Sequence, residues 1–290
     1  MSQFLLKDGR TLDLLDNHHD SKYAILFHHG TPGDSTIWQD WHEELTSQAL
    51  RTISVGRPGY SLSDRNRGRR VVDACADHQE ILDKFGIEHF VSIGWSGGGP
   101  HALATSLDPR CRGIISLAGV GQYGQSDLNF LEGMGPENHD EFGAALKGED
   151  ALREWMNVNA LAMKNVTGNE LRDSLGGLIG DADKEVLAGE FADDMAARMR
   201  RGLGHGFDGW IDDDLAFVQD WGFDLGHITV PVQIWQGDDD FMVPQSHSRW
   251  LGSKIPTAQV KFMSGEGHIS LGVKHRHQIV IEMKSLLADN

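Results

Sequence analysis

The chain has little cysteine and no long apolar run. Its 290 residues include two cysteines, Cys75 and Cys111, too few for a disulfide framework. No stretch approaches the ~18 consecutive apolar residues of a membrane-spanning helix. Residues 1–10 carry charges and lack the apolar segment of a secretory signal. We therefore expect a cytoplasmic protein with no membrane partner.

Basic residues are also scarce. The chain has 26 Lys and Arg against 43 Asp and Glu, a net charge of -17, which argues against a nucleic-acid partner. Most of the excess negative charge falls in residues 121–226, which contain 22 acidic and eight basic residues. These acids could bind the amine of a substrate or lie on solvated helix faces. Their even spread along the segment favours solvated faces.

The most informative segment is residues 90–99, where an apolar strand pattern runs into Gly94-x-Ser96-x-Gly98 and then into a helix-forming stretch. Such a turn exposes a serine between glycines that let the strand and helix backbones pass closely. A dinucleotide-binding loop would need glycine in place of Ser96, and a Walker loop would need a lysine after the glycines. We therefore predict that Ser96 is a nucleophile.

Three further loops follow apolar strand patterns. Residues 23–27 lead into His28-His29-Gly30-Thr31-Pro32-Gly33, and residues 230–235 lead into a loop that ends in Val243-Pro244. Residues 260–263 lead into a loop that contains His268. The first resembles the H-G-x-P oxyanion loop of α/β-hydrolases, and the other two resemble the acid loop and the histidine loop of that family.

The resemblance covers nearly the whole core and is to the branch of α/β-hydrolases that contains esterase-like and proline iminopeptidase-like enzymes. It implies a catalytic triad in the chain order Ser96, Asp240, His268, with Asp240 chosen among three adjacent aspartates by its spacing to Val243-Pro244. It also implies an oxyanion hole made by the main-chain N–H groups of Thr31 and Gly97.

The alternation of strand and helix patterns predicts an α/β fold with a mostly parallel sheet, and the family resemblance makes this an eight-stranded sheet flanked by helices. Residues 1–121 and 227–290 would form the core domain. Residues 122–226 break the alternation and would form an inserted α-helical cap, with helices expected over 141–156, 169–179 and 183–203. A final helix is expected over 273–287.

Other residue types allow more than one interpretation. Among 15 histidines, the pairs His28/His29 and His275/His277 lack accompanying ligands, so we expect no metal and no cofactor. His29 is expected to brace the oxyanion loop by hydrogen bonding. Several apolar residues of the cap could line an ester pocket or pack the cap on the core: Phe130, Leu131, Trp155, Met156, Met163, Phe191 and Met195.

These features predict a serine hydrolase that cleaves a carboxylic ester, or a related acyl bond, of a small molecule. Two alternatives stay open: a proline iminopeptidase-like aminopeptidase, and a hydrolase-fold protein that binds a ligand with little turnover. Epoxide hydrolases and haloalkane dehalogenases of this architecture need a carboxylate where this chain has Ser96, so both activities are disfavoured. The sequence leaves the natural substrate open, and whether the chain forms a homo-oligomer.

Overall fold

The computed structural model describes residues 2–288, and its centre is one sheet of eight strands in the order β1-β2-β4-β3-β5-β6-β7-β8. β1 and β2 pair antiparallel, as do β2 and β4, and all other neighbours are parallel. The predicted mostly parallel, eight-stranded sheet is thus confirmed. The strands are β1 Ser2–Leu5, β2 Thr11–Asp16, β3 Tyr23–His28, β4 Arg51–Val55, β5 His89–Trp95, β6 Cys111–Leu117, β7 Val232–Gly237 and β8 Ala258–Met263.

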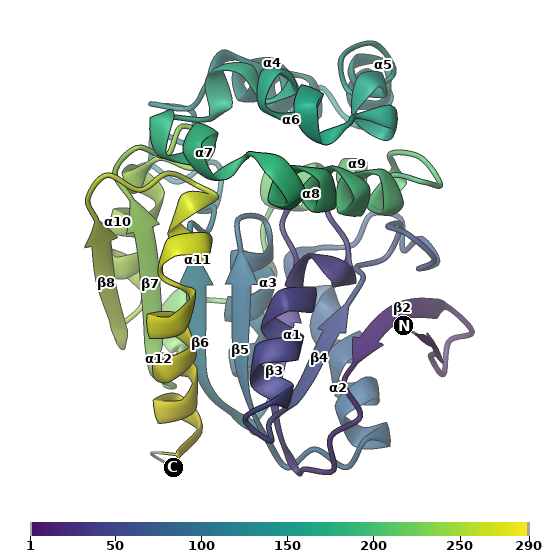
Figure 1. Cartoon of the computed structure of the whole chain (residues 1–290), viewed down its shortest axis with the longest axis vertical. Helices are drawn as coiled ribbons and strands as arrows, with labels where there is room; N and C mark the ends of the chain where they lie inside the picture. Colours follow the sequence, from purple (N-terminus) through teal and green to yellow (C-terminus); the bar gives the residue numbers. More distant parts are fainter. Residues whose placement is uncertain (1, 289–290) are drawn as a thin grey trace.

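Helices cover both faces of the sheet, so most residues of its central strands are buried. α1 (Gln39–Thr46) and α12 (Arg276–Ala288) pack on one face. α2 (Ala74–Lys84), α3 (Gly98–Ala104) and α10 (Gln245–Lys254) pack on the other (Figure 1). No helix within residues 2–288 has both the length and the apolar character needed to cross a bilayer.

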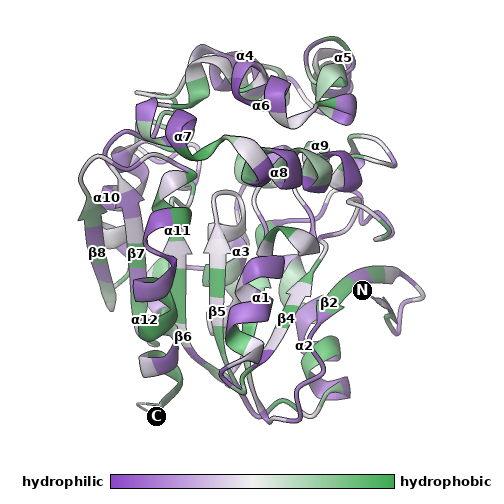
Figure 2. Ribbon diagram, viewed as in Figure 1, coloured by the Kyte–Doolittle hydropathy of each residue, from purple (hydrophilic) through white to green (hydrophobic). Residues whose placement is uncertain are grey.

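A group of helices between β6 and β7 lies above the carboxyl ends of the strands (Figure 1). We call this group the helical layer. Figure 2 shows hydrophilic residues along its outer helices, whereas β5 and β6 are neutral to hydrophobic. The division into a core and a cap at residues 122–226 stays a prediction. The layer consists of α4 Pro136–Ala145, α5 Glu149–Asn159, α6 Gly168–Ser174, α7 Asp181–Val186, α8 Gly189–Gly202 and α9 Asp208–Phe217.

The helix boundaries predicted in this segment were wrong in several places. The helix expected over 141–156 is two helices, α4 and α5, separated at Gly148, whose φ of 101° only glycine adopts readily. The helix expected over 183–203 is likewise divided into α7 and α8, and Gly189 has a φ of 55°. α9 was not predicted. The final helix is interrupted too, into α11 (Ser270–Lys274) and α12.

Several buried histidines make the fold sensitive to acid. Burial lowers the pKa of His42, His78 and His247 to about 4 each. Between pH 6.5 and 4 the unfolded chain therefore binds protons that the folded chain does not, so stability falls as pH falls through this window. Each histidine would contribute up to about 3 kcal/mol of this loss.

We expect the melting temperature to fall steeply between pH 6.5 and pH 4, as followed by circular dichroism. His42→Gln serves as the matched variant, because His42 lies between the hydroxyl groups of Thr52 and Ser54, each 2.7 Å from a ring nitrogen. This variant should be less stable at pH 8 but lose less stability on acidification. A melting temperature that stays level down to pH 4.5 would contradict the argument.

Candidate active site

Ser96 lies on the sharp turn between β5 and α3. Its φ is 57°, a left-handed conformation that is rare for serine and is stored strain. Its main-chain N–H donates to Leu117 O at 2.8 Å, which ties the turn to β6. A Cβ on Gly94 would come within 2.2 Å of Gly98 O, and one on Gly98 would come within 2.2 Å of His28 O. Only glycine fits at these two positions.

The loops after β7 and β8 bring Asp240 and His268 together. His268 Nδ1 is 2.9 Å from Asp240 Oδ2, and both side chains are buried. The N–H groups of Met242 and Val243 donate to Asp240 Oδ1 at 3.0 and 2.8 Å, and Gln236 Nε2 donates to Oδ2 at 3.0 Å. The carboxylate orientation is therefore fixed from both sides.

The two neighbouring aspartates have other surroundings. Asp238 is exposed and accepts the N–H of Gly265 at 2.6 Å. Asp239 is half-buried, and its carboxylate lies beside Gly180. The structure thus places Asp240, and neither neighbour, against the histidine.

The surroundings of His268 fix the orientation of its ring and shift its pKa. Burial works against its charged form, but the carboxylates of Asp240 and Asp183 outweigh burial and raise the pKa of His268 above its ordinary value. With Nδ1–H donating to Asp240, the neutral ring has Nε2 as its acceptor. Trp95 Nε1 donates to His268 O at 3.0 Å and fixes the main chain of the loop.

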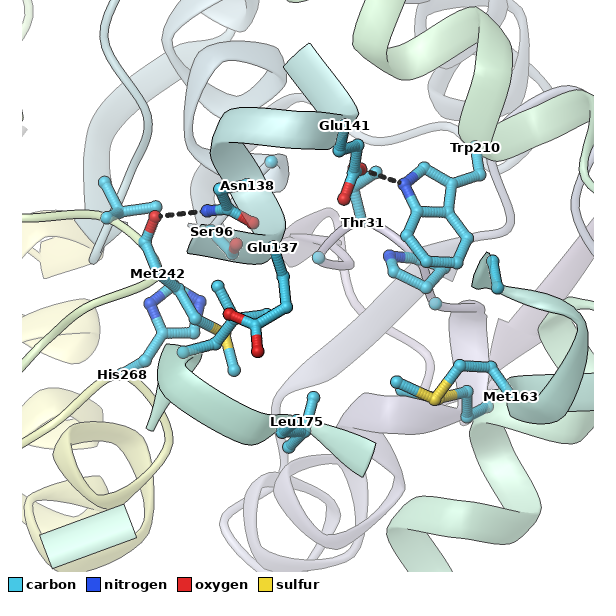
Figure 3. Close-up of a pocket in the computed structure, with 18 of the residues that line it drawn as sticks. Thr31, Ser96, Glu137, Asn138, Glu141, Met163, Leu175, Trp210, Met242 and His268 are labelled. Atoms are coloured by element: carbon cyan, nitrogen blue, oxygen red, sulfur yellow. Dashed lines mark hydrogen bonds between the residues drawn. The ribbon is translucent and has the colours of Figure 1, made fainter. Parts of the chain in front are cut away.

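Ser96 and His268 line one cavity of about 330 Å³, together with Thr31 and Gly97. Figure 3 shows His268 and Ser96 at one side of this cavity and Glu141 with Trp210 at the other. The seven apolar residues named in the sequence analysis serve either to line a cavity or to pack the helical layer on the core. Trp155, Met163 and Met195 line the cavity, Phe130, Leu131 and Met156 pack in the core clusters, and Phe191 lines a neighbouring cavity of about 160 Å³.

The loop after β3 brings Thr31 beside Gly97, since a Cβ on Gly97 would lie 2.3 Å from Thr31 Oγ1. His29 braces this loop as expected: its Nδ1–H donates to Gly30 O at 2.7 Å, and its Nε2 accepts the N–H of Arg57 at 3.0 Å. The Arg57 guanidinium donates to His29 O, to Gly30 O at 2.9 Å and to Thr31 Oγ1 at 3.0 Å.

Asp213 of α9 connects the helical layer to this loop, and sequence reasoning missed it. Its Oδ2 accepts hydrogen bonds from Thr31 Oγ1 at 2.6 Å and from Tyr60 OH at 2.9 Å. Arg57 and Arg69 pair with its two oxygens, each at 2.6 Å. Burial favours the neutral acid, but these two guanidinium groups hold the pKa of Asp213 well below its usual range.

A second carboxyl pair, Glu141 of α4 and Asp214 of α9, lies in the cavity wall. Trp210 Nε1 donates to Glu141 Oε1 at 2.6 Å, while Asp214 Oδ2 has no donor from the described residues. Burial and the nearby charge of Glu141 raise the pKa of Asp214 well above its usual range. Within residues 2–288, no three His, Cys, Asp or Glu side chains are grouped to hold a metal ion.

Comparisons with known proteins agree with the fold. Residues 23–274 match the family model described as alpha/beta hydrolase fold. The chain is 26% identical over 280 residues to a 2-hydroxy-6-oxononadienedioate/2-hydroxy-6-oxononatrienedioate hydrolase of Cupriavidus pinatubonensis, covering 91% of this chain and 87% of the relative.

Solved structures are similar over almost the whole chain at low sequence identity. An esterase from Exiguobacterium antarcticum superposes with a TM-score of 0.72 at 18% identity, covering 99% of this chain and 98% of the other. A bromoperoxidase from Bacillus anthracis superposes with a TM-score of 0.72 at 20% identity, covering 99% of each chain. The chain therefore belongs to the alpha/beta hydrolase fold family.

Proposed function

We propose that this chain is a serine hydrolase that cleaves a carboxylic ester, or a related acyl bond, of a small molecule. One observation carries the proposal: Ser96, on its strained turn, and His268, bonded to the buried Asp240, line the same cavity. A cavity of about 330 Å³ is in the size range of small-molecule sites.

In the first step, Ser96 Oγ attacks the substrate carbonyl carbon while His268 Nε2 takes the hydroxyl proton. The carbonyl π pair moves onto the oxygen, and the N–H groups of Thr31 and Gly97 stabilise that negative charge. Asp240 holds the ring so that Nδ1 keeps its proton and balances the imidazolium. When the intermediate collapses, the leaving alcohol takes the proton from Nε2.

In the second step, a water molecule gives its proton to His268 Nε2 and attacks the acyl-enzyme. Collapse of this second intermediate releases the carboxylic acid and returns the proton to Ser96. We further propose that the helical layer acts as the cap over residues 122–226, closing the cavity from above and limiting access of water.

The cavity wall favours a neutral or cationic substrate. The Cupriavidus relative is named for dioates, which carry two carboxylates. This cavity is lined by four acidic residues, Glu137, Asp140, Glu141 and Asp214, and by one basic residue, Arg198. Arg198 already donates to Asp40 at 3.0 Å. A dianionic substrate would therefore meet net repulsion.

The Glu141–Asp214 pair supports a second candidate, an aminopeptidase-like activity on substrates with a free amine. Burial and the nearby Glu141 raise the pKa of Asp214, and its Oδ2 has no donor within the described residues. A substrate ammonium group would supply both a donor and a balancing charge. Ester hydrolysis remains the first candidate activity because most of the cavity lining is apolar.

Labelling and turnover test the proposal together. A fluorophosphonate should label the wild type at Ser96 and should not label Ser96→Ala. The wild type should hydrolyse 4-nitrophenyl acetate or butyrate over many turnovers. Proline 4-nitroanilide and its N-acetylated form, assayed in parallel, separate the candidates, because only an amine-binding site distinguishes them.

Each outcome decides between the candidates. Turnover of the esters with neither anilide cleaved supports the esterase. Cleavage of the free-amine anilide and not its acetylated form supports the aminopeptidase. A wild type that is neither labelled nor active refutes both and favours a protein that binds its ligand without turnover.

A further inference from the structure

Asp183, on α7 of the helical layer, forms hydrogen bonds with the loop that carries His268. Its side chain is 0% exposed and accepts three consecutive main-chain N–H groups. His268 N donates to Oδ2 at 2.9 Å, and the N–H groups of Ile269 and Ser270 donate to Oδ1, each at 2.8 Å. Hydrogen bonds to a charged acceptor are about twice as strong as neutral ones. The residue is therefore an anchor for the backbone of the histidine loop.

The loop is shaped to receive this carboxylate. A Cβ on Gly267 would lie 2.5 to 2.6 Å from the three carboxyl atoms of Asp183, so any other residue at this position would push them away. Ser270 Oγ accepts the N–H of Gly267 at 2.8 Å, which closes the turn beneath the carboxylate. Three successive N–H donors and the space left by Gly267 thus form a binding site for the Asp183 carboxylate, which is 85 residues from His268 in the sequence.

The same part of the helical layer also meets the acid loop. Ile179 forms an antiparallel bridge with Asp240, and Gly180 lies against the Asp239 carboxylate. Residues 179–183 therefore contact both loops that carry the proposed base and its acid partner. A shift of this segment would move both loops.

We propose that Asp183 is a positioning residue: by binding three main-chain N–H groups it fixes the histidine loop and so aims the imidazole of His268 at Ser96. This inference rests on the proposed function, in which His268 is the base. The arrangement makes the alignment of the base depend on where the helical layer sits.

Asp183 also acts through its charge. The carboxylates that face His268 are Asp240, from the loop after β7, and Asp183, from α7, and both raise its pKa. Glu266, in the same loop, is paired with Lys274 at 3.6 Å and His275 at 3.4 Å. Because the base works in its neutral form, the acid limb of the pH–rate profile follows this pKa. Removing the Asp183 charge should therefore move that limb to lower pH.

The test compares Asp183→Asn, Asp183→Ala and the control Asp181→Asn, whose side chain is fully exposed on the same helix. kcat for a 4-nitrophenyl ester should fall about tenfold in the asparagine variant and about a hundredfold in the alanine variant, with little change in KM. The acid limb of kcat/KM should move down by roughly half a pH unit in Asp183→Asn. Asp181→Asn should match the wild type in all three quantities.

A merely structural Asp183 would give a different result: lower thermal stability with an unmoved acid limb, which would overturn the inference. Gly267→Ala provides a second route, since it keeps the carboxylate but displaces it, and it should also lower kcat. If Asp183→Ala does not fold, the Asp183→Asn and Gly267→Ala variants still distinguish a positioning role from a merely structural one. Failure of the proposed function is seen separately, as a wild type that fluorophosphonate does not label.

Discussion

Replacement of Asp240 by asparagine is expected to lower kcat about ten-thousandfold with little change in fold, because it changes which ring nitrogen of His268 carries the proton. The two N–H donors at Oδ1, from Met242 and Val243, require an oxygen at that position. Only one donor besides the histidine, Gln236 Nε2, faces Oδ2, so the asparagine NH2 should take that place, 2.9 Å from His268 Nδ1. It would donate to Nδ1, and Nε2 would hold the proton and could not accept one from Ser96.

The adjacent Asp239→Asn is the matched control, since the Asp239 carboxylate lies beside Gly180 rather than against His268. It should keep kcat within about threefold of the wild type, as is usual for a change at a partly exposed site. Steady-state kinetics with a 4-nitrophenyl ester and circular dichroism measure both effects. A large loss in Asp239→Asn, with Asp240→Asn near wild type, would place the acid one residue earlier.

The sequence could predict the parts of the site that have local signatures. Ser96 is marked by Gly94 and Gly98, where an added Cβ would lie 2.2 Å from a neighbouring main-chain oxygen. Thr31 and Asp240 each follow a buried strand of the sheet, and His268 follows β8, the parallel strand at its edge. Parallel strands bring the loops at their carboxyl ends to the same edge, so strand order alone brings these residues together.

The remaining contacts have no local signature. Asp183 meets His268 across 85 residues and Asp213 meets Arg57 across 156, and no motif around either aspartate distinguishes it from the other acidic residues of the segment. The acids of residues 121–226 were therefore interpreted as solvated faces. For Glu141, Asp183 and residues 212–214, which are buried, this interpretation was wrong. Their burial depends on how the helical layer packs on the sheet, and periodicity within one helix does not determine that.

Loss of the Asp213 carboxylate is expected to have the largest effect on stability. It balances two buried guanidinium groups, those of Arg57 and Arg69, whose side chains are each only 2% exposed. Arg69 has two side-chain nitrogens, Nε and Nη1, without a partner among the described residues. Its other acceptors are the neutral carbonyls of Pro58 and Gly209, at 3.5 and 3.3 Å, which carry no balancing charge. Breaking a buried ion pair from one side leaves uncompensated charge, which typically costs 3 to 5 kcal/mol. We expect Asp213→Ala to lower the free energy of unfolding by about that amount.

Urea denaturation measures this loss, and Asp208→Asn on the same helix is the matched control. Asp208 pairs with Arg65 at 3.2 Å and Arg153 at 2.7 Å but is 41% exposed, so its replacement should cost about 0 to 1 kcal/mol. The folded fraction of Asp213→Ala should also lose kcat, because Thr31 Oγ1 and the guanidinium of Arg57 are held by the missing carboxylate. Equal losses of stability in the two variants would mean that the Asp213 cluster is no more than a surface ion pair. A stability loss without any change in kcat would mean that the loop after β3 keeps its position without the Asp213 carboxylate.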